Sequence, residues 1–193
     1  KGIGAALYMT LFRSLIHAAS TFDQFSPGQD QKNFTPAERL LHAVSLTNNY
    51  VIETHEAACM FATVFIGILN PIDGKLNYIN CGNDPALIIG KDGTIHAELH
   101  PTGAAVGVKA PPKYTVKEIT LASDELLLAF TDGIPDAQSI NGEFYGNERL
   151  RKLLVANSAP IELLNKIETD LHQFIGEANQ FDDITLMALQ RKA

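Results

Sequence analysis

The sequence of 193 residues lacks the features that define several large classes of protein. Its only cysteines, Cys59 and Cys81, do not have the spacing of zinc ligands, which favours two reduced, buried thiols and a cytoplasmic protein. No apolar run approaches the roughly 20 residues that a membrane-spanning helix needs. Lysine and arginine do not cluster and the formal net charge is −7, so nucleic acid is not an expected partner.

The start of the chain also lacks an initiator methionine and the layout of a signal peptide. Instead, Lys1-Gly2-Ile3-Gly4 leads directly into an apolar helical pattern. Because a mature protein seldom begins inside an element, we expect the larger, C-terminal part of a domain whose first strands lie upstream. No repeat, low-complexity tract or linker divides the sequence, which predicts one domain over residues 1–193.

The order of the periodic segments predicts an α+β fold. Helical patterns cover residues 3–19 and 35–53, and Thr35-Pro36-Ala37-Glu38 supplies a capping box for the second. The inward face of this second helix is expected to be Leu40, Val44, Thr47 and Val51. The expected strands are 60–69, 76–81, 86–89, 94–96, 114–121 and 125–130. A short helix capped by Asn147, a longer helix from Pro160 and a strand over 184–189 complete the chain. The longer helix is expected to bury the face formed by Leu164, Ile167, Leu171 and Phe174.

Carboxylates stand at the ends of two apolar strands. Leu126 to Phe130 runs into Thr131-Asp132-Gly133, and Phe181-Asp182-Asp183 runs into Ile184-Thr185-Leu186. A charge in such a place costs free energy unless it is compensated. Because strand ends converge at the rim of a sheet, these carboxylates can share a hard cation such as Mg²⁺ or Mn²⁺. Each motif alone fits an ordinary turn or charged loop better than a metal site, so the prediction rests on both.

Other polar candidates carry less weight. Three histidines lie in helical stretches, where surface or packing roles are expected: His17, His42 and His172. His96 and His100 flank a hairpin from which they could reach a cleft, and Arg13 could meet a phosphate, although a surface ion pair is the expected role. Asp136 follows the first acidic motif closely and fits either a supporting residue or a solvated turn.

Five segments, in order along essentially the whole chain, resemble the SpoIIE/RsbU branch of the metal-dependent (PPM-type) serine/threonine protein phosphatases. They are Gly2-Ile3-Gly4-Ala5-Ala6-Leu7, Asn80-Cys81-Gly82-Asn83-Asp84-Pro85-Ala86-Leu87, Thr102-Gly103 with Val106-Gly107-Val108, Phe130-Thr131-Asp132-Gly133-Ile134-Pro135-Asp136-Ala137, and Asp182-Asp183-Ile184-Thr185-Leu186. No single motif is decisive, but five in order at suitable separations are hard to obtain by chance.

The resemblance implies a four-layer αββα sandwich of two antiparallel sheets flanked by helices, here without its first strands. It implies two Mn²⁺ or Mg²⁺ ions in the intact domain, with Asp132 and Asp182 as catalytic ligands of one ion. Asp183 would be a neighbouring acid or a ligand of an accessory ion. Gly133, which lets the backbone turn tightly beside the ion, would support the site together with Asn83 and Asp136.

The implied activity is hydrolysis of phosphoserine or phosphothreonine on a bacterial signalling protein, such as an anti-sigma-factor antagonist, by a metal-activated water. A sensor or receiver domain is expected upstream. Two alternatives are a catalytically inactive, phosphatase-like interaction module and a hydrolase of small phosphoesters. An aspartate just upstream of Lys1 would favour the enzyme over the module.

The chain departs from the family pattern in two places. The aspartate that bridges both metals belongs to strands upstream, so this chain alone is expected to hold one ion weakly or none and to have little activity. The absent strands should leave an exposed sheet edge, which a homodimer or strand exchange would cover. In addition, Asn83-Asp84 replaces the family's usual His-Asn, which keeps hydrogen-bonding capacity but removes a candidate general acid or phosphate contact.

Overall fold

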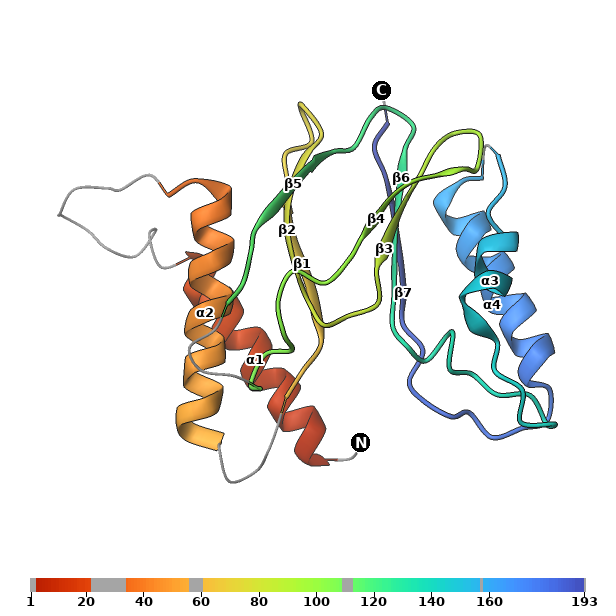
Figure 1. Ribbon diagram of the computed structural model, residues 1–193, viewed down its shortest axis with the longest axis horizontal. Coiled ribbons are helices and arrows are strands. Elements are labelled where there is room, and N and C mark those ends of the chain that lie inside the picture. The colour runs from red at the N-terminus through yellow and green to blue at the C-terminus, as the bar shows by residue number, and fades with distance from the viewer. Residues whose placement is uncertain (1–2, 22–33, 56–60, 109–112, 157, 193) are drawn as a thin grey trace, which may run out of the picture. The chain divides into compact units, whose positions relative to one another are not determined.

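The computed structural model describes residues 3–21, 34–55, 61–108, 113–156 and 158–192 (Figure 1). The chain forms two compact units, each assembled from three separate stretches. The first unit takes residues 1–70, 76–82 and 101–119, and the second takes 71–75, 83–100 and 120–193. Each unit contains one antiparallel sheet and two helices, in agreement with the predicted mixture of helices and strands.

The first unit contains two long helices and a three-stranded sheet. Its elements are α1 (Ile3–Thr21), α2 (Pro36–His55), β1 (Val64–Leu69), β2 (Lys75–Cys81) and β5 (Lys117–Thr120). The sheet order is β1-β2-β5, and β1 pairs antiparallel with β2. The buried core joins the helices to the sheet through Phe12, Leu40, Val44, Ile79, Cys81 and Val106. Cys81 is a buried free thiol whose pKa burial raises to about 12, whereas Cys59 lies outside the described residues.

The predicted capping box at the start of α2 is confirmed. The Thr35 N–H donates to the Glu38 carboxylate at 2.8 Å, and the Glu38 N–H donates to the Thr35 hydroxyl at 3.2 Å. These bonds satisfy N–H groups that the first turn of a helix otherwise leaves without partners. The predicted apolar face of this helix is also buried, at Leu40, Val44, Thr47 and Val51.

The second unit contains a four-stranded sheet and two helices. Its elements are β3 (Ala86–Ile89), β4 (Ile95–Leu99), β6 (Leu126–Phe130), α3 (Gly146–Lys152), α4 (Pro160–Ile175) and β7 (Leu186–Gln190). The sheet order is β4-β3-β6-β7, with all neighbours antiparallel. Every residue of β6 is buried, and the core extends from Leu128 to Ile134, Leu163, Ile167 and Leu171. This core fixes the central strand from which the first acidic motif emerges.

Two local predictions were wrong. Asn147 does not cap the short helix, because α3 already begins at Gly146 and its N-cap position is Tyr145, with no side-chain cap. The buried face of α4 is Leu163, Ile167, Leu171 and Ile175, so the face is rotated from the predicted one and Leu164 and Phe174 are only partly buried. Among the helices of the described ranges, none has the length and apolar character that crossing a membrane requires.

Candidate functional site

The antiparallel pairing of β6 with β7 brings the two acidic motifs to the same end of one sheet. The last pair of the ladder is Phe130 with Leu186. Beyond it the Thr131 N–H donates to the Thr185 carbonyl at 3.2 Å, and the Thr185 N–H donates to the Thr131 hydroxyl at 3.0 Å. The Thr131 hydroxyl in turn donates to the Asp183 carbonyl at 3.2 Å. The segments that carry Asp132 and Asp183 are therefore bonded directly to each other.

Gly133 lies at the closest approach of the two segments. A Cβ atom at this position would collide with the carbonyl oxygen of Asp183. The prediction that this glycine allows a tight backbone arrangement therefore has a specific physical reason. The reason is the proximity of the second acidic segment, not an unusual backbone angle.

A compact turn follows Asp132. The Asp136 N–H donates to the Asp132 carbonyl at 2.9 Å, and the Ile134 N–H donates to the Thr131 carbonyl at 3.1 Å. Ile134 is fully buried, whereas Asp132 and Asp136 are exposed. The turn therefore inserts an apolar side chain into the core between two carboxylates that face solvent.

Asn83 and Asp84 join this turn from the segment that precedes β3. The Asn83 side-chain amide donates to the Phe130 carbonyl at 3.0 Å and to the Asp84 carbonyl at 3.1 Å, which attaches the segment to the end of β6. The pKa of the Asp84 carboxyl is raised by burial and then by the neighbouring charges of Asp132 and Asp136. Sequence reasoning treated Asp84 only as a departure from a family motif. Because Asp84 directly follows Asn83, a predicted residue of the site, the sequence could have identified Asp84 as another acid near Asp132.

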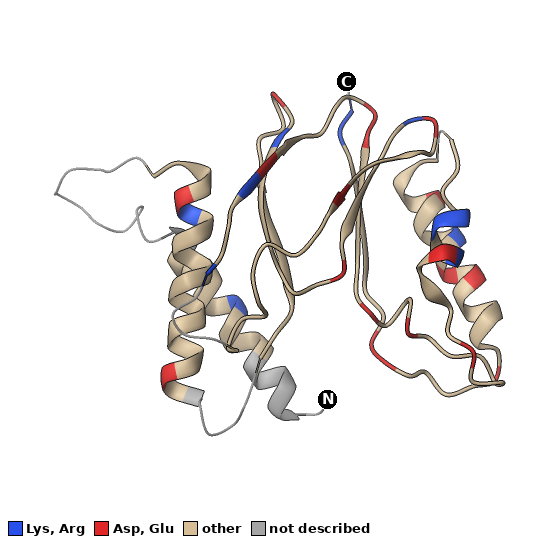
Figure 2. Cartoon of the chain, in the orientation of Figure 1, with Lys and Arg blue, Asp and Glu red and all other residues tan. Residues whose placement is uncertain are grey.

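Asp182 lies in a local turn before β7. Its carboxylate Oδ1 accepts from the Asp183 N–H at 2.7 Å, and its carbonyl accepts from the Gln180 side chain at 2.7 Å. The Asp182 residue is half-buried and Asp183 is exposed. Figure 2 shows acidic positions along the loops at this end of β6 and β7.

The donor chemistry of this end of the sheet fits a hard divalent cation, because every candidate ligand is a carboxylate or carbonyl oxygen. After burial, the charges of Asp132 and Asp136 also raise the pKa of Asp84, and a cation would offset this repulsion between carboxylates. However, among the residues that the structure describes, no group of three or more His, Cys, Asp or Glu is arranged to hold a metal ion.

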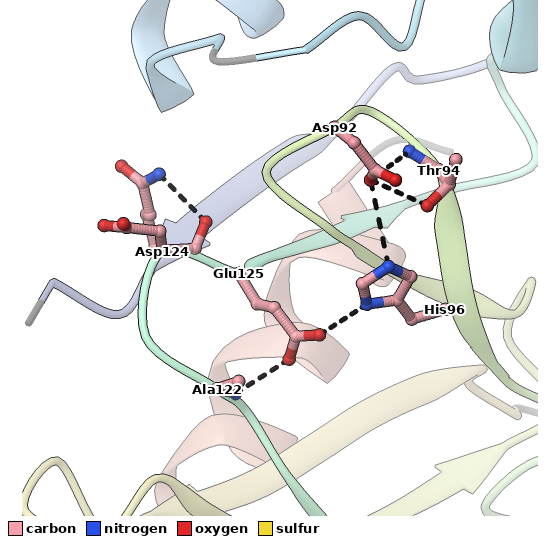
Figure 3. Close-up of polar contacts among 7 residues, drawn as sticks. Asp92, Thr94, His96, Ala122, Asp124 and Glu125 are labelled. Carbon is pink, nitrogen blue, oxygen red and sulfur yellow. Dashed lines mark hydrogen bonds and ion pairs between the residues drawn. The ribbon is translucent and has the colours of Figure 1, made fainter.

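The weaker histidine candidates lie away from this end of the sheet or in local pairs. Figure 3 shows His96 between two carboxylates: its Nδ1 is 2.6 Å from Glu125 and its Nε2 is 3.8 Å from Asp92. Glu125 immediately precedes β6 whereas Asp132 follows it, so His96 lies at the opposite end of the strand. His100 is 3.9 Å from Glu98 and His172 is 3.9 Å from Glu168.

Comparison with known proteins identifies the family. The sequence matches the family model of stage II sporulation protein E (SpoIIE) over residues 1–192, and the chain belongs to this family. Protein IcfG from Synechocystis sp. is 38% identical over 206 residues, which cover 99% of this chain and 32% of that protein. Phosphoserine phosphatase RsbU from Bacillus subtilis is 25% identical over 194 residues, which cover 100% of this chain and 53% of that protein. The chain thus spans about a third and about half of these two relatives.

The fold agrees with the family. The SiaA-PP2C domain of Pseudomonas aeruginosa superposes with a TM-score of 0.77 at 20% identity, covering 98% of this chain and 71% of that chain. The structure therefore has the PPM-type (PP2C) phosphatase fold, as the motif resemblance predicted.

Proposed function

We propose that this chain is the larger part of a single metal-dependent phosphatase domain that hydrolyses phosphoserine or phosphothreonine on a bacterial signalling protein. The observation that carries the proposal is the convergence of the two acidic motifs at one end of the β6–β7 pair, where Thr131 bonds both Thr185 and Asp183. Membership of the SpoIIE family and the similarity to RsbU, a phosphoserine phosphatase, support the same activity.

The cofactor that we infer is Mn²⁺ or Mg²⁺. Two more distant structures of this fold support this choice: the catalytic domain of PstP in complex with two manganese ions (TM-score 0.61, 15% identity) and RsbX with magnesium (TM-score 0.61, 15% identity). When bound, such a cation acidifies water and offsets charge on phosphoryl oxygens. In this chain Asp132 and Asp182 would hold it, with Asp183 as a neighbouring acid or accessory ligand.

The remaining residues of the site position these carboxylates. Asn83 fixes the end of β6 through its bond to the Phe130 carbonyl, Gly133 permits the contact with Asp183, and Asp136 closes the turn over Asp132. No group of three or more His, Cys, Asp or Glu among the described residues could hold a metal ion by itself, and we propose that further ligands come from other residues of the gene product. Residues 1–193 alone should then bind a metal weakly or not at all, since affinity depends on the number and charge of the ligands.

We further propose a cytoplasmic phosphoprotein substrate, with an anti-sigma-factor antagonist as the expected class, and an upstream sensor or receiver domain. Two similar structures contain further domains: the RsbU and RsbW domains of Rv1364c from Mycobacterium tuberculosis, and the PP2C phosphatase domain of SpoIIE from Bacillus subtilis with a fragment of its regulatory domain. A homodimer would be one way to cover an exposed sheet edge.

Phosphate release by the full-length gene product tests the proposal. Phosphoserine and phosphothreonine peptides should be hydrolysed with Mn²⁺ or Mg²⁺ and not after chelation. Asp132→Asn and Asp182→Asn should each lower kcat/KM by about 100-fold, because losing a ligand should cost at least as much as losing one of its outer partners. Asp124→Asn is the matched control, since Asp124 lies at the other end of β6 and should leave activity unchanged.

Three outcomes would contradict parts of this account. Full activity of both ligand variants would reject the assignment of Asp132 and Asp182. Faster hydrolysis of small phosphoesters than of any phosphopeptide would reject a protein substrate. No hydrolysis with either metal would favour the catalytically inactive interaction module, which the incomplete ligand set among the described residues also fits.

A further inference from the structure

A partly buried cluster joins the start of α3 to α4, next to the turn that carries Asp132. The Tyr145 hydroxyl donates to Asp170 Oδ2 at 2.8 Å, and Arg149 donates to both oxygens of the same carboxylate at 2.9 and 3.3 Å. The Arg149 guanidinium also lies over the rings of Tyr145 and Phe174, at 5.3 and 4.7 Å from their centroids. We call these four residues, Tyr145, Arg149, Asp170 and Phe174, the Tyr145 anchor.

The backbone connects this anchor to the acidic turn. The Tyr145 N–H donates to the Ala137 carbonyl at 2.9 Å, and the Gly146 N–H donates to the Pro135 carbonyl at 2.9 Å. Residues 131–137 are thus held from two sides. On one side Thr131 bonds the segment that enters β7, and on the other Tyr145 and Gly146 bond the end of the turn.

The Tyr145 side chain is held with little freedom. It is only 4% exposed, and its ring packs edge-on against Phe174 with centroids 5.4 Å apart. Burial, followed by the hydrogen bond to Asp170, raises the pKa of Tyr145, so its hydroxyl stays a donor at neutral pH. A buried hydroxyl without an acceptor lowers the stability of the fold. The position of the Tyr145 side chain therefore depends on its acceptor, Asp170.

We propose that Tyr145 and Asp170 are positioning residues for metal binding: through Ala137 and Pro135 they hold the turn in which Asp132 projects its carboxylate. This inference rests on the proposed function. Outer partners that orient metal ligands typically contribute strongly to metal affinity. A cluster that only stabilises the fold predicts something different, namely lower stability with unchanged metal affinity in the protein that remains folded.

Mn²⁺ titration of the full-length gene product, followed by the electron paramagnetic resonance signal of free Mn²⁺, tests the inference. Tyr145→Phe removes one oxygen and keeps the ring, and Asp170→Asn keeps the shape of the acceptor. Both variants should weaken Mn²⁺ binding by about tenfold, the lower end of the loss that such partners cause. The Mn²⁺ concentration for half-maximal phosphate release should rise equally, while KM for the phosphopeptide stays within about twofold and kcat recovers at saturating Mn²⁺.

Glu98→Gln supplies the matched control. Glu98 forms a comparable bidentate pair with Arg151, another arginine of α3, at 2.9 and 2.9 Å. Losing this pair should leave Mn²⁺ affinity unchanged. If wild type binds Mn²⁺ and Tyr145→Phe binds it equally tightly, the positioning role is overturned while the proposed function stands. If wild type neither binds Mn²⁺ nor releases phosphate, the proposed function itself fails.

Discussion

At Gly133 the backbone of the first acidic segment passes so close to Asp183 that no side chain fits between them. This contact determines how near the two carboxylate-bearing segments can come. It also explains why a glycine follows Asp132 here, since even a methyl group would force the segments apart. The distance between the two acidic segments therefore depends on Gly133 having no Cβ atom.

Gly133→Ala should lower the free energy of unfolding by about 1–3 kcal/mol, because inserting a methyl group into a tightly packed contact has a cost of this size. Urea denaturation followed by circular dichroism measures it. The variant should also lose Mn²⁺-dependent phosphatase activity. Gly142→Asn is the comparison: at Gly142 there is open space and φ is +77°, which asparagine tolerates. Equal stability of Gly133→Ala and wild type would contradict the contact.

Individual residues were predicted with unequal success. The convergence of the segments that carry Asp132 and Asp183 was predicted from the carboxylates at the ends of apolar strands. The proximity of Asp84 to Asp132 did not follow, because it depends on the Asn83 bond to the Phe130 carbonyl across 47 positions of sequence. No local pattern encodes such a bond. The metal-binding roles of Asp132, Asp182 and Asp183 stay predictions.

At the scale of elements, α3 and α4 are joined by an ion pair and hydrogen bonds at Asp170. The hydrogen bond from Arg149, and then that from Tyr145, hold the pKa of Asp170 below its usual value. A carboxyl whose folded pKa is depressed stabilises the protein above its unfolded pKa, and this contribution is lost as the pH falls through the folded pKa.

The difference in unfolding free energy between wild type and Asp170→Asn should therefore depend on pH. It should be constant from pH 7 to about pH 5 and should shrink steadily below about pH 4, where wild-type Asp170 becomes protonated. Chemical denaturation at a series of pH values measures the difference. A gap of equal size at pH 7 and pH 3 would show that the Asp170 charge does not stabilise the pairing of α3 and α4.

The positions of the elements followed from the sequence better than their ends did. The strand predicted over 114–121 is β5, Lys117–Thr120, because Tyr114 packs on the first core and donates its hydroxyl to Asn48 at 3.0 Å. The Tyr114 ring thus packs near α2 and does not belong to a paired strand. Similarly, β7 begins at Leu186 and not at Ile184, since Thr185 pairs with the side chain of Thr131. Such ends depend on tertiary partners that periodicity does not contain.

At the scale of the whole molecule, the chain has two compact units with separate buried cores, one centred on Ile79 and Val44 and the other on Leu128 and Ile167. The order of elements predicted the α+β class, and the five motifs indicated the PPM-type fold that the comparison with SiaA supports. Which strands neighbour one another could not be derived from order alone, because β6 pairs with β3 and β7 across long connections.

For the whole molecule, we propose that acids at the end of β6 and before β7 hold one divalent ion. Crystals of the full-length gene product grown with Mn²⁺, with diffraction measured at the manganese absorption edge, test it most directly. The account predicts an anomalous peak with carboxylate oxygens of both Asp132 and Asp182 within about 2.0–2.2 Å, as for octahedral divalent ions. A manganese ion bound elsewhere, with these two carboxylates turned to separate surfaces, would contradict it.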